Sequence, residues 1–322
     1  MIRDFVFPLS DATGVPEPAL RLLLALLFGY PLAMVYRLLF LPSSSPTPSP
    51  NSSPQKSFFL HSPFWRNLYI VVGGMGVAGF FSRFDASELQ HAFLTILVTW
   101  SIIKVSFVSG IPRSFAASLI WIGNFGYLMY CYYRHASTTY DINFLTPQSV
   151  LCLRMISLGM DFYDGCPKAA KKKIKDDGLI VKEYERPLAT APGLFETLGY
   201  SYFYGAFLVG PQFPFELYRR YLTLELFDES PDKTKPTTCV TVPSSLKYTL
   251  RCFLLGAFYL ALQQVANVFF PTSFLIDSAF SKLPFWKKIA WIWVVGKFVL
   301  NKVLLLKHSI ESARFTYSLV PY

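Results

Sequence analysis

The feature that most constrains this chain is a series of long apolar segments separated by polar connections. Most are about 20 residues long, the length that a helix needs to cross a bilayer. Charged residues make up only 16% of the chain, whereas soluble globular domains have about 25%. A soluble protein needs more polar surface than this, and a disordered chain has fewer apolar residues. The sequence therefore predicts an all-α polytopic membrane protein with roughly seven to nine transmembrane or re-entrant helices.

Six of the apolar segments are predicted to span the membrane without interruption by polar runs. They cover residues 20–41, 64–81, 91–108, 114–133, 246–270 and 285–306. Pro31 predicts a kink in the first of them. Lys104 in the third would cost about 2.5–3.5 kcal/mol at the bilayer centre. We therefore expect Lys104 near a helix end or facing the protein interior.

Residues 147–164 form a short apolar segment that carries charges and is expected to lie inside a bundle. Arg154 and Asp161 are seven residues apart, almost two turns, so they share one helical face. One interpretation pairs Asp161 with Arg154 or another cation and makes Asp164 a cap for the next element. The alternative is a divalent-metal site at Asp161 and Asp164 for intramembrane prenyl transfer. That chemistry usually needs more carboxylates, so a structural polar pair is favoured and no metal site is predicted.

Residues 194–213 are rich in aromatic residues and glycine and end at Gly210-Pro211, which predicts a broken or re-entrant helix. Buried Glu and Tyr side chains need polar partners in lipid. They would form a structural hydrogen-bond network or line a substrate passage, with Lys104 as a candidate cation for Glu196. Glu196, Tyr200, Phe203, Tyr204 and Leu208 recur at helical spacing on one stripe. The tunnel candidates are Glu196, Tyr200, Tyr202, Tyr204, Gly210, Pro211 and Gln212.

The net charge of +10 is concentrated in residues 165–190 and 282–307, which lie beside apolar segments. The expected partner is therefore an anionic membrane face and no nucleic acid. By the positive-inside rule, the basic loop 165–190 is cytosolic. If every intervening segment crosses, the flexible Ser/Pro loop 42–57 and the turn at 110–113 are cytosolic too. The N-terminus and the loops 82–90 and 134–146 then face the lumen.

The chain is predicted to form a single membrane domain, residues 1–322, with an atypical tail at 307–322. Its five cysteines have no CxxC spacing and predict neither a disulfide framework nor a zinc site. None of the familiar nucleophile, phosphate-loop, zinc-protease or dinucleotide motifs occurs. The glycines at 73, 74 and 76 lie within an apolar segment and indicate close helix packing. The four histidines, at segment ends or in loops, are not predicted to be catalytic: His61, His91, His135 and His308.

The run GYSYFYGAFLVGPQF at residues 199–213 resembles the signature of the membrane-bound O-acyltransferase (MBOAT) family. The likeness is closest to its metazoan lysophosphatidylcholine and lysophospholipid acyltransferases. Shorter stretches agree in the same order, from residue 14 to residue 306. They are Gly29-Tyr30-Pro31, Tyr140-Asp141-Ile142, the DFYDG run at 161–165, Leu255-Gly256, Phe258-Tyr259-Leu260, Pro284-Phe285-Trp286 and the GKFVL run at 296–300.

The resemblance implies a multi-pass enzyme of the endoplasmic reticulum membrane that moves a fatty acyl chain from acyl-CoA to a lysophospholipid. Acyl-CoA is then a substrate, no cofactor is expected, and membrane lipids are the other partners. The family's catalytic His and Asn are expected beyond residue 322, so no catalytic residue is carried over. This chain is expected to be the inactive N-terminal portion of the enzyme. The alternative is a non-enzymatic lipid-binding or partner protein, and a homo-oligomer stays open.

Overall fold

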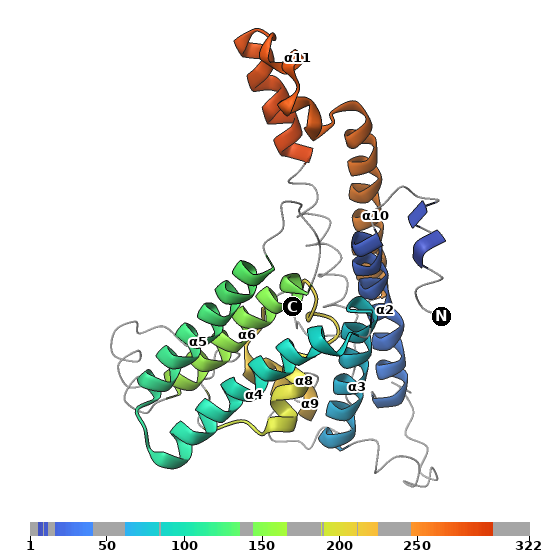
Figure 1. Ribbon diagram of the computed structural model, residues 1–322. Helices are drawn as coiled ribbons and strands as arrows, with labels where there is room; N and C mark the ends of the chain where they lie inside the picture. Colours follow the sequence, from blue (N-terminus) through green and yellow to red (C-terminus); the bar gives the residue numbers. More distant parts are fainter. Residues whose placement is uncertain are drawn as a thin grey trace, which may run out of the picture. The chain divides into compact units, whose positions relative to one another are not determined.

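In the computed structural model, every regular element among the described residues is a helix, as the sequence predicts (Figure 1). The described residues are 6–8, 10–11, 17–40, 62–83, 85–135, 144–165, 188, 190–210, 212–224 and 246–298. The Ser/Pro loop 42–57, the tail 307–322 and nearly all of the basic loop 165–190 lie outside them. The chain divides into two compact units, one from Met1 to Val242 and one from Pro243 to Val320. The single membrane domain stays a prediction.

Among its described residues, the first unit has five long helices and two short ones, besides the helical residues 6–8 and 10–11. The long helices are α2 (Glu17–Phe40), α3 (Pro63–Phe81), α4 (Ala86–Ser109), α5 (Arg113–Arg134) and α6 (Leu145–Asp164). The short ones are α8 (Leu194–Ser201) and α9 (Phe215–Thr223). α5 packs along α6, α4 packs against both, and α2 pairs with α3. The second unit has α10 (Leu246–Phe269), the 3₁₀ helix η2 (Thr272–Ile276), α11 (Ser278–Ser281) and a helix over 285–298.

The helix ends follow from local residue chemistry. The Ser62 hydroxyl accepts from the Phe64 N–H at the start of α3, and Pro63 occupies the first position, where no N–H is needed. Asp85 caps α4 in the same way by accepting from the Ser87 N–H at 2.9 Å. α4 ends at Ser109 and is capped by Gly110, whose φ of 67° suits a residue without a Cβ. Short polar sequences thus fix where the long apolar helices begin and stop.

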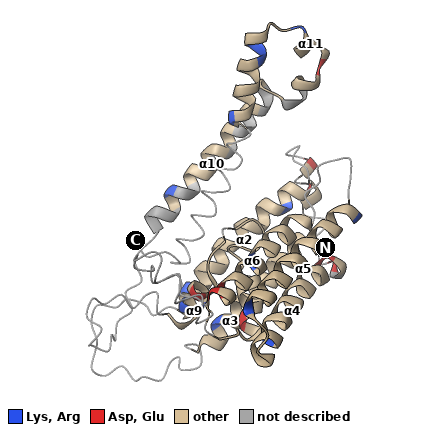
Figure 2. Ribbon diagram, turned by 90° about the vertical axis from the view of Figure 1, so that its left-hand side faces the viewer, with Lys and Arg blue, Asp and Glu red and all other residues tan. Residues whose placement is uncertain are grey.

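The outer faces of the first unit remain strongly apolar. Leu38, Val108 and Ile122 are among many large side chains that are exposed on the helices. Figure 2 shows that charged residues are sparse along these helices. By length and composition, two described helices could cross a membrane, at Glu17–Phe40 and Ser87–Ser109. The count of seven to nine spans therefore stays a prediction. Lys104 is exposed within the last two turns of α4, which is the near-end position expected for it.

Where they are described, segments predicted to share one side of the membrane are neighbours in the first unit. Glu17 at the start of α2 forms an ion pair of 3.0 Å with Arg83, in the turn between α3 and α4. At the other end, Arg113 donates to the carbonyls of Phe162 at 3.1 Å and Leu188 at 3.0 Å. The start of α5, the end of α6 and residue 188 are therefore neighbours. Which end faces the cytosol stays a prediction.

Candidate functional site

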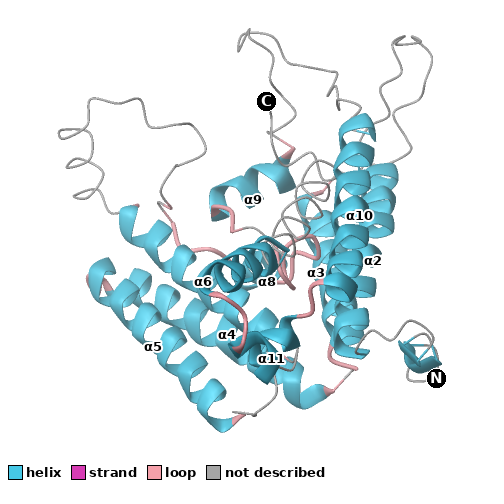
Figure 3. Cartoon of the chain, turned by 90° about the horizontal axis from the view of Figure 1, so that it is seen from above, coloured by secondary structure: helices cyan, strands magenta, loops and turns pink. Residues whose placement is uncertain are grey.

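Residues 188–215 fold back on themselves inside the first unit. They start beside Arg113 at one end, and Pro192 then accepts a hydrogen bond from Trp100 of α4. α8 lies among α3, α4 and α6 (Figure 3). Phe207 reaches a cavity at the opposite end, and the Phe215 N–H returns to Asp161 near the end of α6 at 3.3 Å. The prediction of a broken helix is confirmed, whereas a re-entrant position in a membrane stays a prediction. We call the described residues from 188 to 215 the re-entrant segment, because they turn back at Phe207.

The position of the break differs from the sequence-based expectation. α8 stops at Ser201, and residues 202–210 and 212–214 are irregular but mostly buried. The sequence placed the break at Gly210-Pro211, so the predicted helical stripe is wrong beyond Tyr200. Phe203, Tyr204 and Leu208 are buried on the irregular backbone, where helical spacing has no meaning. Apolar side chains can be buried on irregular backbone as well as on a helix. An apolar run by itself therefore does not show that a segment is helical.

Arg154 holds the irregular backbone in place. Its side chain is fully buried on α6. Nη1 donates to the carbonyls of Tyr200 and Ser201, each at 3.1 Å, and Nη2 donates to Ala206 at 2.8 Å. The first two carbonyls end α8, where a positive charge is favourable. The Arg154 guanidinium therefore donates to backbone carbonyls and does not pair with Asp161. The Arg154–Asp161 pair, one of the pairings that the sequence suggested, is wrong.

The three tyrosines among the tunnel candidates are all buried by side-chain packing. Tyr200 donates its hydroxyl proton to the carbonyl of Phe213 at 2.8 Å, which closes the re-entrant segment on itself. The ring of Tyr202 packs on Phe207 with centroids 5.1 Å apart. Tyr204 packs edge to face against Tyr69 of α3 at 6.3 Å. These contacts favour a structural network, and a substrate passage along these residues stays a prediction.

Glu196 and Arg219 connect α8 with α9. Arg219 Nε donates to one Glu196 oxygen at 2.7 Å and Nη2 to the other at 3.2 Å, a bidentate pair. This hydrogen bonding raises the pKa of Arg219. The sequence suggested Lys104 as the cation for Glu196, and the structure puts Arg219 there. Both side chains keep more than a fifth of their surface exposed, so water weakens the attraction.

We expect Glu196→Gln to lower the free energy of unfolding by about 1 kcal/mol, the usual upper value for partly exposed pairs. The glutamine amide has nearly the shape of the carboxylate but lacks its charge and one of the two oxygens that accept from Arg219. Glu216→Gln is the matched control, because Glu216 lies 3.9 Å from the same guanidinium and makes a looser pair. Denaturant titration of the purified chain in detergent measures both. An equal effect of the two substitutions would contradict the assigned pairing.

The end of the signature run contains the other tunnel candidates. The Gly210 N–H donates to the Ala206 carbonyl at 3.2 Å, in the turn that Arg154 also binds. Gln212 donates its amide to the carbonyl of Val150 on α6 at 3.0 Å, and its side chain is exposed. Pro211 lies outside the described residues. Gln212 thus holds the part of the re-entrant segment after Phe207 against α6, and Gly210 closes the turn at Ala206.

Asp161 and Asp164 occupy the last turn of α6, as the sequence predicts. Asp161 Oδ2 accepts from the Phe215 N–H, the first residue of α9, where a carboxylate stabilises the helix N-terminus. The cap predicted for Asp164 concerns residues that are not described. Within the described part of the chain, no group of three His, Cys, Asp or Glu side chains is arranged to hold a metal. Asp161 thus has a structural role of its own.

Two side chains of α3 that the sequence did not single out also hold this region. Asn67 donates to the Phe195 carbonyl at 2.7 Å and accepts from the Tyr218 hydroxyl. Arg66 donates to the Leu222 carbonyl at 2.7 Å. Both are buried. In the sequence, Arg66 and Asn67 stand out only as a charged and an amide side chain at the start of an apolar segment. The same residue types also occur at helix ends that face water, so the sequence does not distinguish the two roles.

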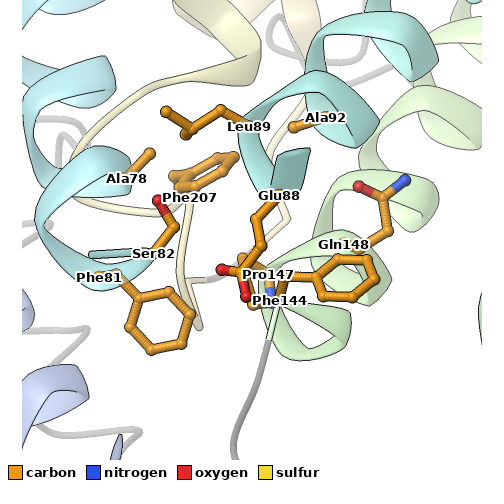
Figure 4. A pocket seen from close by; sticks show the side chains of 10 residues that line it. All are labelled: Ala78, Phe81, Ser82, Glu88, Leu89, Ala92, Phe144, Pro147, Gln148 and Phe207. Carbon is orange, nitrogen blue, oxygen red and sulfur yellow. The ribbon is translucent and has the colours of Figure 1, made fainter. Parts of the chain in front are cut away.

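A cavity lies at the tip of the re-entrant segment, where α3 ends and α4 and α6 begin (Figure 4). The re-entrant segment contributes Phe207 to the lining of the cavity. Ser82, Glu88 and Gln148 supply the polar atoms in its walls. The remaining lining is apolar and aromatic: Ala78, Phe81, Leu89, Ala92, Phe144 and Pro147.

Known proteins resemble this chain over most of its length. A family model for membrane-bound O-acyltransferases matches residues 129–321. Lysophospholipid acyltransferase 5 of Homo sapiens is 30% identical over 301 residues, which are 91% of this chain and 52% of the relative. The protein of the same name from Drosophila melanogaster is 29% identical over 297 residues, 92% of this chain and 51% of the relative. Lysophospholipid acyltransferase of Schizosaccharomyces pombe is 25% identical over 297 residues. That match covers 89% of this chain and 50% of the relative.

The chain spans about half the length of these curated relatives. The family model covers more than half of the chain and includes the re-entrant segment with the signature run. The all-helical fold and the apolar outer faces agree with a membrane-bound enzyme family. The chain therefore belongs to the membrane-bound O-acyltransferase family.

Proposed function

We propose that this chain handles the substrates of a lysophospholipid acyltransferase, which moves a fatty acyl chain from acyl-CoA to the free hydroxyl of a lysophospholipid. The observation that carries the proposal is the re-entrant segment. The family signature, residues 199–213, is the stretch that turns back inside the helices, held by Arg154. The names of the relatives, which match nine-tenths of the chain, support the substrate class.

The proposed setting is a multi-pass position in the endoplasmic reticulum membrane. Arg66, Arg113 and Arg219 lie at the end of the first unit that the positive-inside rule makes cytosolic. The anionic CoA group would approach this end, where positive charge attracts it. The re-entrant segment enters and leaves at the same end, and we propose that the acyl donor approaches α8 and α9 from there.

We also propose that residues 1–322 alone do not catalyse the transfer. Acyl transfer to a hydroxyl needs a general base, most often histidine. The two described histidines are engaged in structural contacts. His91 Nδ1 lies 2.6 Å from the Tyr127 hydroxyl, and its ring stacks on Phe144. His135 Nδ1 lies 3.1 Å from the Cys131 carbonyl oxygen.

Photolabelling of the purified 322-residue chain in lipid nanodiscs tests this function. A photoreactive fatty acyl-CoA should label the chain, and unlabelled acyl-CoA should suppress the labelling while farnesyl diphosphate should not. The same sample, incubated with acyl-CoA and lysophosphatidylcholine, should yield no phosphatidylcholine. Product formation would refute the inactivity of this chain, and labelling that acyl-CoA fails to suppress would refute substrate handling. Magnesium-dependent competition by farnesyl diphosphate, lost in Asp164→Asn, would favour prenyl transfer instead.

A further inference from the structure

A groove on the outer face of α5 and α6 is large enough to hold a lipid chain. The two helices lie side by side (Figure 1), and they pack closely at Gly159, where a Cβ would lie 3.1 Å from Ile120. The groove has a volume of about 420 Å³, which is within the range of ligand pockets. Its lining on α5 runs from Ser114 to Ile122, about 12 Å along the helix.

The walls of this groove are apolar and open to the surroundings of the protein. Trp121, Ile122 and Met160 line it and are exposed. Of the described residues that line it, none is charged. Walls without charge do not suit a phosphate or another ionic group, whose transfer from water needs a charged or polar partner. In a membrane-bound protein, such a groove faces the bilayer and suits a hydrocarbon chain.

Three hydroxyl groups in the groove have no partner within the described part of the chain. They belong to Ser114, Ser118 and Tyr163, and none of them forms a hydrogen bond there. Helical serines commonly donate to the carbonyl four residues back, as Ser149 does to Leu145 at 2.6 Å, but Ser118 does not. A hydroxyl without an acceptor is costly in lipid, where no water replaces the missing bond. These donors therefore need an acceptor from the ligand.

The hydroxyl groups lie near one end of the two helices, at the depth expected for lipid esters. Ser118 is five residues, about 8 Å, from the start of α5. The polar layer on each side of a bilayer is about 5–8 Å thick. If α5 starts at the membrane surface, as the sequence predicts, Ser118 lies where headgroups meet hydrocarbon. Trp121 and Tyr163 are of the residue types that are enriched at this interface.

We propose that this groove holds one ester-linked chain of a membrane glycerophospholipid. The ester carbonyl would accept hydrogen bonds from the hydroxyls of Ser114, Ser118 and Tyr163, and the chain would lie along Trp121 and Met160. A carbonyl is a neutral acceptor attached directly to the chain, so it complements uncharged donors beside apolar walls. This ligand is a lipid of the surrounding bilayer and differs from the acyl-CoA of the proposed function.

Photolabelling of the full 322-residue chain in maltoside micelles tests the proposal. The probe is a diester phosphatidylcholine with a diazirine in one chain, and mass spectrometry locates the label. It should be found on peptides that contain Trp121 or Met160. Unlabelled diester phosphatidylcholine should compete about five- to tenfold better than its diether analogue, which lacks the carbonyls, because one net hydrogen bond has about this value.

Two variants separate the space of the groove from its hydrogen bonds. Ser118→Leu fills the groove and should remove the label from it. Ser114→Ala, Ser118→Ala and Tyr163→Phe combined keep the space and should abolish the preference for the diester. Gly126→Leu is the matched control on α5, because Gly126 is outside the lining and a Cβ there meets no atom within 4 Å. It should change neither the labelling nor the preference.

Equal competition by the diester and the diether would overturn the proposal. So would unchanged labelling in Ser118→Leu with an unaltered melting temperature. If Ser118→Leu fails to fold, the combined variant decides, and an unchanged diester preference there would reject the site. An unlabelled groove in a dimer that Ser118→Leu dissociates would assign this face to a second copy instead. Acyl-CoA should not compete here, so loss of the acyl-CoA labelling described above would refute the proposed function and leave this result standing.

Discussion

Replacing Arg154 by methionine is expected to lower the free energy of unfolding by about 3 to 5 kcal/mol. The substitution leaves the carbonyls of Tyr200, Ser201 and Ala206 without their donor inside a packed, water-poor region. Unsatisfied carbonyls at this depth are costly, and irregular backbone is tolerated there only when it is bonded internally. The re-entrant segment should therefore open before the long helices do.

Denaturant titration and cysteine labelling measure this effect. A cysteine introduced at Gln212 reports on the part of the re-entrant segment after Phe207 and should react faster with a thiol reagent when Arg154 is replaced. Arg219→Met is the control, because this arginine is partly exposed and its loss should cost about 1 kcal/mol. Arg154→Lys keeps the charge but lacks the planar fork, so it should fall between the two. Equal stability of Arg154→Met and Arg219→Met would refute the role assigned to Arg154.

Gly74→Ala is expected to destabilise the chain by about 1 to 3 kcal/mol or more, the cost of overpacking a core. A Cβ at Gly74 would overlap the Tyr202 carbonyl, where the irregular backbone touches α3. Backbone cannot rotate away as a flexible side chain can, so one of the two segments must shift. The substitution should also displace Phe207, which is five residues further along the re-entrant segment.

Gly76→Ala provides a control on the same helix, because a Cβ there meets no atom within 4 Å. Alanine favours a helix over glycine by about 1 kcal/mol, so this variant should be as stable as the unchanged protein or slightly more so. Thermal unfolding in detergent compares the two substitutions directly. A Gly74→Ala protein as stable as Gly76→Ala would show that α3 and Tyr202 do not pack as described.

The sequence predicted the long helices well because their signal is local. Apolar runs of about 20 residues identify helices wherever the surroundings are lipid or protein. Caps such as Asp85 and Gly110 add boundaries that neighbouring residues alone explain. Arg154 and the 194–213 run were both recognised as unusual, since a charge and a Gly-Pro pair are costly in an apolar helix.

The details of the candidate site depended on residues that are far apart in the sequence. Glu196 takes Arg219 as its partner, 23 residues away, and no periodicity links them. The break at Tyr202 has no helix-breaking residue, because long-range donors such as Arg154 stabilise the irregular backbone instead. Glu88 shares its cavity with Phe207, and only the return of the re-entrant segment brings these two together.

The sequence by itself determined that this protein is helical, apolar on its outside and similar to the MBOAT family, because composition, segment length and the signature run are properties of the chain. The tertiary structure alone decided how residues 188–215 turn back, which carbonyls Arg154 binds and what surrounds Glu88. The physical reason is that helix formation depends on neighbours along the chain, whereas satisfying buried backbone groups depends on donors that folding brings from elsewhere.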